Sequence, residues 1–234
     1  MAQVVEQVAA ARAVAAPAAR VRRTRRLGPV LAIAFIVVLA LIGVLAPVLA
    51  PYDPINQDLA NQVGGPTAQH LLGTDSFGRD VLSRLIWGTR PALLGTLVAV
   101  ATACVIGLPW GLVSGYAGGL VDMVLMRVAD ALLVLPGLVI ALAITTALGA
   151  SLTNAMLAVG IVFSPGLARV LRSGVLTVRD REYVVVTRMY GLRPWHRMLH
   201  HVLPNAVAPA LIQITLLTGI AFLAQAALGF LGIG

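Results

Sequence analysis

The sequence predicts an all-α, polytopic membrane protein. Hydrophobic residues make up 59% of the chain and charged residues only 11%, well below the roughly 25% charge of soluble domains. The apolar residues fall in long blocks separated by polar intervals, as in membrane-spanning helices. The net charge of +8 does not indicate a nucleic-acid binder, because the arginines lie at the ends of apolar blocks, where membrane topology requires them.

The first predicted span is residues 27–50, an apolar run that would be roughly 36 Å long as a helix. It follows residues 1–26, an Arg-rich cytoplasmic tail that we expect to be disordered. A cleaved signal peptide has a similar basic start. We favour a retained helix because the run is long enough to span and ends at Pro47 and Pro51, without a clear small-residue cleavage site.

After the first span, residues 51–90 are polar and expected to be extracytoplasmic. Residues 91–234 form the transmembrane core, which contains a polar, basic interval at 173–205. Within this core, Ser164–Pro165 is expected to break the fourth span. The second to fifth spans are expected at residues 91–116, 121–148, 154–171 and 206–228.

The arginines predict how the chain is oriented. With the N-terminus in the cytoplasm, that side receives the arginines of the tail and those from Arg169 to Arg197, while the opposite side receives only Arg79, Arg84 and Arg90. The positive-inside rule therefore places the N-terminus and residues 173–205 in the cytoplasm.

Residues 181–205, called the bracket below, carry helix signals although they lie between spans. Asp180–Glu182 place acidic groups at the start of a short helix, where its dipole favours them. Gly191 is suited to the left-handed residue after that helix, and Pro194 suits the first turn of a second one. Two short helices joined at a glycine are therefore expected.

The first bracket helix is expected to carry an apolar face of Tyr183, Val184, Val186 and Tyr190. Such a face outside the bilayer calls for a groove on a partner protein. An amphipathic bracket lying on anionic lipid fits the same residues. The physical pattern alone leaves both interpretations open.

Three blocks of the sequence resemble the permease subunits of ABC importers. Glu-Tyr-Val at 182–184, Gly191 and His-Val-Leu-Pro-Asn at 201–205 resemble the "EAA" coupling loop, which reads E-Y-V-E-A-A-R-x-x-G and H-x-x-P-N in the peptide and nickel branch. L-G-T-D-S-F-G-R-D-V-L-S-R at 72–84 resembles L-G-T-D-x-x-G-R-D-x-x-S-R, and A-A-L-G-F-L-G-I-G at 226–234 is similar to A-S-L-S-F-L-G-L-G. Their order indicates the second, C-type permease of dipeptide, oligopeptide or nickel importers.

The resemblance implies a type I ABC-importer fold, with five spans visible of six expected, in a bacterial inner membrane. It implies a pore shared with a homologous permease, two ATPase subunits docked in the cytoplasm and an extracytoplasmic substrate-binding protein. The chain itself would be no enzyme and hold no cofactor, since ATP and Mg would bind the ATPases. Independently, a P-loop requires a lysine, and the sequence has none.

The resemblance also implies two sets of site residues. The coupling loop would dock on the ATPase and move as a rigid lever, and the outer motif would lie on the opposite side of the membrane. The coupling set is Arg181, Glu182, Tyr183, Val184, Val185, Val186, Thr187, Gly191, His201, Pro204 and Asn205, and the outer set is Gly73, Thr74, Asp75, Gly78, Arg79, Asp80, Ser83 and Arg84.

The sequence departs from the family pattern in three places. Val185-Val186-Thr187 stands where the family has its Glu-Ala-Ala core, which removes one possible charged contact with the ATPase. Gln225 stands where relatives usually have glutamate. The sixth helix is missing, so we expect the chain to be shortened at its C-terminus.

The sequence offers other candidate sites. Arg127 and Asp130 are three residues apart and are expected to pair with each other, although intramembrane charges are also functional candidates. Asp122 is expected in a loop. For residues 75–84 the favoured interpretation is an interfacial helix capped by Asp75 or Ser76, and the alternative is contact with a binding protein.

His196, His200 and His201 have metal-ligand spacing, but lack an evident further ligand and supporting shell, so no metal is expected. Two other functional classes stay open. A secondary transporter would show inverted repeats and several midplane charges, and a non-transporting membrane scaffold would need no ATPase. The cargo, peptide or nickel, is not distinguished by any residue.

Overall fold

The computed structural model describes residues 27–232. The prediction for the tail, residues 1–26, falls outside this range. The described residues form helices, with one isolated β-bridge between Thr74 and Asp80, so the all-α prediction is confirmed. The helices are α2 (Leu27–Val44), α3 (Ala46–Leu49), α4 (Val81–Ala117), α5 (Gly119–Val134), α6 (Gly137–Leu148), α7 (Leu152–Val178), α8 (Glu182–Met189), α9 (Pro194–Arg197), α10 (Leu203–Ala206) and α11 (Ala208–Phe230), with a 3-10 turn at Leu59–Asn61 and a π turn at Met198–Val202.

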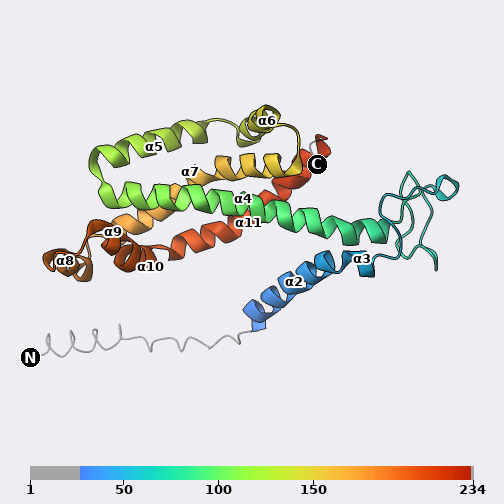
Figure 1. The fold of residues 1–234 in the computed structure, drawn as a ribbon, viewed down its shortest axis with the longest axis horizontal. Helices are drawn as coiled ribbons and strands as arrows, with labels where there is room; N and C mark the ends of the chain where they lie inside the picture. The colour runs from blue at the N-terminus through green and yellow to red at the C-terminus, as the bar shows by residue number, and fades with distance from the viewer. Residues whose placement is uncertain (1–26, 233–234) are drawn as a thin grey trace, which may run out of the picture.

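The bundle is elongated and is built around α4, α7 and α11 (Figure 1). Helices α5 and α6 run along one side of this bundle. Helix α2 lies outside the bundle and packs against α4. The polar loop of residues 51–80 lies at one end, and α8 and α9 lie at the other (Figure 1). The coupling-loop motif and the outer motif are therefore at opposite ends of the molecule.

Three helices, α4, α7 and α11, are long and apolar enough to cross a membrane, and the bent pair α5–α6 adds a fourth if its two helices form one span. Helix α2 is a shorter apolar helix over Val30–Val44, which α3 extends after Leu45. Helix α4 begins ten residues before the predicted second span, at Val81. Its 37 residues give a length of roughly 55 Å, more than the hydrocarbon thickness of about 30 Å.

Two predictions about the third and fourth spans are wrong, and both concern proline. The third span is not one helix, because it bends by 95° between α5 and α6. Leu135 is extended there (φ −80°, ψ 144°), as the residue before Pro136 prefers. The fourth span is not broken at Pro165, since α7 runs through it without interruption. The Ser164 hydroxyl donates to the Ile161 carbonyl (2.7 Å), the acceptor that Pro165 leaves without its helical N–H.

Helices α4 and α7 approach until their backbones are in contact. A Cβ on Gly111 would collide with the backbone of Ala168, and one on Gly160 would collide with the carbonyl of Ala99. Small residues at a helix interface allow this close packing in membranes. The two helices therefore form one unit, against which the remaining elements pack.

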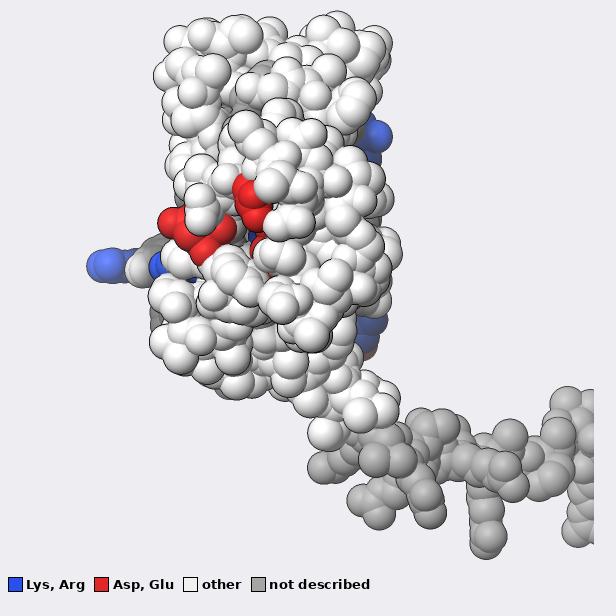
Figure 2. Space-filling view, turned by 90° about the vertical axis from the view of Figure 1, so that its right-hand side faces the viewer, with Lys and Arg blue, Asp and Glu red and all other residues white. Residues whose placement is uncertain are grey.

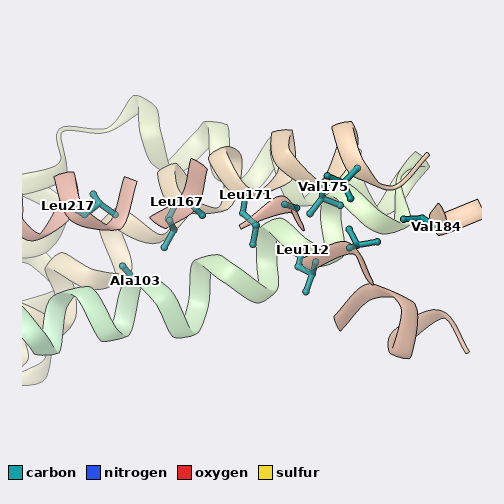
Figure 3. Packing of buried hydrophobic residues seen from close by; sticks show 11 residues of the cluster. Ala103, Leu112, Leu167, Leu171, Val175, Val184 and Leu217 are labelled. Atoms are coloured by element: carbon teal, nitrogen blue, oxygen red, sulfur yellow. The ribbon is translucent and has the colours of Figure 1, made fainter. Parts of the chain in front are cut away.

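The buried apolar residues form two clusters along this unit. The first lies around Ala99, Met156 and Leu228, toward the 51–80 loop. The second, called the bracket-end cluster, runs from Ala103 and Leu217 to the bracket (Figure 3). Its buried members are Ala103, Leu112, Leu167, Leu171, Val175, Val178, Val184, Val202, Ala206, Ala210 and Leu217.

The end of the molecule at the 51–80 loop shows a mostly uncharged surface, with acidic side chains near its middle (Figure 2). Asp53 and Asp58 of this loop are exposed. The opposite end carries the arginines of the bracket, so charge is distributed unequally between the two ends.

Candidate functional site

The bracket has the helix–glycine–helix geometry that the sequence predicts. Helix α8 begins at Glu182 and ends at Met189, with Tyr190 as its C-cap. Gly191 follows with φ +73°, the left-handed region that other residues avoid. Its N–H donates to the carbonyl of Arg188 (3.1 Å), and Pro194 begins α9.

The second arm of the bracket continues into α11. Helix α9, the π turn and α10 follow one another with hardly a break, and α11 begins at Ala208. Pro204 lies in the first turn of α10, just before α11. The Asn205 side chain donates to the carbonyl of His201 (2.8 Å). The segment 201–205 therefore connects the bracket to a spanning helix.

The predicted apolar face of α8 is divided between the inside and the outside of the protein. Val184 is only 1% exposed and belongs to the bracket-end cluster, at the end of the row of side chains in Figure 3. Tyr183, Val186 and Tyr190 are exposed. Successive helix positions differ by about 100°, so Val184 and Val186 cannot share a face. Val184 thus fixes α8 to the chain's own core, which corrects its assignment to the docking face.

The remaining coupling-loop residues lie on or near the surface. Arg181 precedes α8 and is exposed, and Val185 and Thr187 are partly buried. The Thr187 hydroxyl donates to the Val184 carbonyl (2.6 Å). Two exposed bracket residues outside the predicted coupling set are Met189 and Trp195, 82% and 60% exposed. An apolar residue before the glycine and one after Pro194 were the signals that could have identified them.

A network of charges that the sequence did not predict joins α4, α5 and α7 beside the bracket. Arg172 donates to both carboxylate oxygens of Asp122 (2.5 Å each), and the hydroxyl of Ser114 donates to the same carboxylate. Arg179 donates to the carbonyl of Gly115 (2.8 Å). We call Ser114, Asp122, Arg172 and Arg179 the clasp. It holds the α4–α5 turn against the part of α7 that leads to α8.

Two sequence predictions about these charges are wrong. Asp122 lies in the first turn of α5 and not in a loop. Asp130 pairs with Arg169 of α7 and not with Arg127, because α7 places its arginines beside α5. Among residues 27–232, Arg127 makes no ion pair.

The residues of the outer motif form a network of hydrogen bonds and ion pairs with one another. Asp75 accepts backbone N–H bonds from Phe77 (2.8 Å) and Arg79 (3.0 Å), and pairs with the guanidinium groups of Arg79 and Arg84. Partial burial would raise the pKa of Asp75, but these backbone hydrogen bonds and Arg79 lower it to about 2. Asp75 therefore closes a turn and does not cap a helix, which corrects the prediction of a separate interfacial helix.

The helix cap is Asp80, at the start of α4. Its carboxylate accepts from the N–H and the hydroxyl of Ser83 (2.7 Å each) and lies 3.0 Å from Nδ1 of His70. Burial opposes its ionisation, but these hydrogen bonds outweigh burial and hold the pKa of Asp80 below its usual value. Ser83 also accepts from the N–H of Tyr52 (3.1 Å), so the motif ties the loop to α4.

The other residues of the motif complete this network. The Thr74 hydroxyl accepts from the N–H of Gly64 (2.9 Å) and donates to the Asn61 carbonyl. Gly73 and Gly78 have positive φ, and a Cβ on Gly78 would collide with the backbone of Asp58. These contacts give the motif a role in holding the loop together.

Replacing Asp80 by alanine is expected to lower the free energy of unfolding by about 1–2 kcal/mol, the usual cost of losing a helix cap. The measurement is thermal unfolding of the chain in lipid nanodiscs. Asp80→Asn is the matched control, since its side-chain oxygen still caps the helix and should recover most of the loss. An alanine variant that unfolds at the wild-type temperature would contradict this role.

The three bracket histidines lie together, but do not form a metal site. The rings of His196 and His200 stack with centroids 4.1 Å apart, and His201 lies edge-on to His196 at 6.2 Å. Within the part of the chain that the structure describes, no group of three His, Cys, Asp or Glu side chains is arranged to hold a metal ion.

Comparison with known proteins identifies close relatives. Residues 107–234 match the family described as binding-protein-dependent transport system inner membrane component, and residues 25–69 match the N-terminal transmembrane domain of oligopeptide transport permease C. A dipeptide transport system permease protein of Alkalihalophilus pseudofirmus is 40% identical over 83% of this chain and 64% of its own length. One from Haemophilus influenzae is 38% identical over 88% of this chain and 72% of its own length, and a probable D,D-dipeptide transport system permease protein of Escherichia coli is 41% identical over 85% and 67%.

Proposed function

Because the chain belongs to the family of binding-protein-dependent transport system inner membrane components, we propose that it is a permease subunit of an ABC importer for peptides. It would form half of a translocation pore, with a homologous permease as the other half. ATP hydrolysis, with bound ATP and Mg, would be carried out by two separate ATPase subunits. A binding protein outside the membrane would deliver the cargo.

The observation that carries this proposal is the bracket. It lies at one end of the bundle (Figure 1), exposes Tyr190 and Met189 at 82% each, and carries four arginines against one glutamate over residues 181–205. An exposed apolar surface rimmed by charge is typical of a protein interaction site. Membership in the family of binding-protein-dependent transport components favours a bracket that docks on an ATPase over one that lies on lipid.

The bracket is also built to transmit movement. Its first arm is fixed to the core by Val184, and its second arm continues into α11. The clasp connects the adjoining part of α7 to α4 and α5. Displacement of the bracket by closure of the ATPase pair would therefore act on all four spans of the core and shift the pore between outward-open and inward-open states.

Peptides are favoured over nickel as cargo because the relatives are described as permeases for dipeptides and related peptides. We propose that the bracket and the N-terminus of this multi-pass inner-membrane protein face the cytoplasm. The arginines of residues 169–197 and of the tail support this orientation through the positive-inside rule. The outer motif would then face the binding protein's compartment.

Replacing Tyr190 by aspartate is expected to weaken the binding of the ATPase subunits at least tenfold, because a charge enters the exposed apolar surface. The measurement is the amount of ATPase that copurifies with the full chain from membranes. Ile55→Asp is the matched control: Ile55 is 75% exposed, but lies in the loop at the opposite end. A wild-type chain that retains no ATPase would overturn the importer proposal and favour a membrane scaffold or a secondary transporter.

A further inference from the structure

One exposed arginine lies where the spanning helices meet the 51–80 loop. Arg90 of α4 directly precedes the predicted second span. Its guanidinium carbon lies 5.7 Å from the ring centroid of Trp87. Trp87 is three residues nearer the 51–80 loop, so the charged head is directed toward that end, as in an arginine that extends to the surface of a bilayer. Because tryptophan is enriched at the same boundary, the two residues mark the level of the lipid headgroups on α4.

Two grooves meet at Arg90. The α2 groove, about 260 Å³, lies between α2 and α4, and the α7 groove, about 420 Å³, lies between α4 and the start of α7. Arg90 and Leu94 line both grooves. The other walls are mostly apolar and include Ala40 and Val44 in the α2 groove and Val98 and Leu152 in the α7 groove. A single cation therefore stands between two apolar grooves.

Arg90 also connects α2 to the bundle. A Cβ on Gly43 would lie 3.6 Å from Cγ of Arg90 and 3.2 Å from Oγ1 of Thr89, so the stem of Arg90 packs against α2. Helix α2 lies outside the bundle, and its main tertiary contact is with α4 (Figure 1). A ligand in the α2 groove would add a second connection between α2 and the bundle.

The shape and charge of this site suit a phospholipid. Both grooves lie on apolar helices, so lipid can reach them, and two acyl chains fit their walls. The phosphate of a lipid accepts charge-assisted hydrogen bonds from a guanidinium, and basic sites between spanning helices bind anionic headgroups. The exposed side chain of Arg90 is accessible to such a phosphate, whereas the guanidinium of Arg84, on the same helix, already pairs with Asp75.

We propose that Arg90 binds the phosphate of an anionic phospholipid, with one acyl chain in the α2 groove and the other in the α7 groove. The bound lipid attaches α2 to the bundle. Apolar walls alone would also suit a helix of a second protein, but the exposed cation between the two grooves favours the lipid. The site lies at the opposite end of the molecule from the bracket (Figure 1), and it does not depend on the proposed function.

The test measures, by native mass spectrometry, the lipid that the full chain retains from detergent containing equal amounts of phosphatidylglycerol and phosphatidylcholine. The wild-type chain should retain phosphatidylglycerol in preference. Arg90→Gln should lower this retention about fivefold, the effect expected of one basic residue beside an anionic headgroup. Arg90→Lys, which keeps the charge, should retain most of the lipid. Arg193→Gln is the control, because Arg193 is an exposed arginine of the bracket, and it should leave retention unchanged.

A second pair of variants tests the α2 groove. Ala40→Phe places a ring in this groove while Arg90 remains, so it should also lower the retention of phosphatidylglycerol severalfold. Ala34→Phe is the matched control, because Ala34 is exposed on the same helix and lines neither groove.

Three results would overturn the inference. Equal retention by Arg90→Gln and the wild type would exclude Arg90 as the phosphate ligand. Equal retention by Ala40→Phe and Ala34→Phe would exclude the α2 groove as the seat of an acyl chain. Loss of the lipid when the chain is purified together with a homologous permease would assign the groove to that protein.

Discussion

Gly191→Val is expected to reduce transport by the reconstituted importer at least tenfold, while the spanning helices stay folded. Gly191 has φ +73°, a conformation that a β-branched residue adopts only with strain. A Cβ at this position meets nothing within 4 Å, so the effect comes from the backbone alone. Valine would turn the chain out of the left-handed region and change the angle between α8 and α9.

The matched control for Gly191 is asparagine, which tolerates the left-handed region better than other residues. Gly191→Asn should keep most of the transport and most of the substrate-stimulated ATP hydrolysis, whereas valine should lose both. Unfolding temperatures of the two variants should stay close together. If the valine variant transports and stimulates ATPase as the wild type does, the bracket does not act as a lever.

Breaking the clasp is the second substitution with a large expected effect. Asp122→Arg leaves Arg172 facing a like charge in a partly buried site, since the two side chains are 16% and 28% exposed. Losing hydrogen bonds between charged groups costs about 1.5–3 kcal/mol, and the charge reversal adds repulsion. Arg172→Asp should destabilise the protein similarly, because Asp122 then faces a second carboxylate.

The double exchange Asp122→Arg with Arg172→Asp restores opposite charges and should recover part of the unfolding free energy, which a double-mutant cycle measures. Asp180→Ala is the control, because Asp180 pairs with Arg179 at 72% exposure and such pairs contribute little. The single variants should also hydrolyse more ATP per molecule transported. If the coupling ratio stays at the wild-type value in a folded single variant, the clasp only stabilises the protein.

The spans could be predicted from sequence because hydropathy and helix length depend on local composition. Their internal shape could not. Pro136 and Pro165 look alike in sequence, yet only Pro136 breaks a helix. Pro165 is fully buried, and the hydroxyl of Ser164 donates to the Ile161 carbonyl that the proline leaves free. Pro136 is exposed, so tertiary packing decided the difference.

In the candidate site, too, local features could be predicted from the sequence, and tertiary contacts could not. The elbow at Gly191 follows from the local rules for helix ends and was predictable. The partners of Asp122 and Asp130 lie 50 and 39 residues away in sequence, whereas the i,i+3 rule offered Arg127 as a nearby partner. Val184 and Val186 had equal apolar character, and only the direction of α8 against the core separates the buried one from the exposed one.

The position of Val184 has a consequence for how such a protein diverges. Because Val184 of α8 packs in the bracket-end cluster, a substitution deep in that cluster would shift α8 and change the surface that α8 exposes. If the bracket docks on an ATPase as proposed, selection for a matching ATPase would also act on residues, such as Val175, that are buried within the chain. Hybrid importers would then need compensating substitutions in the interior as well as on the surface.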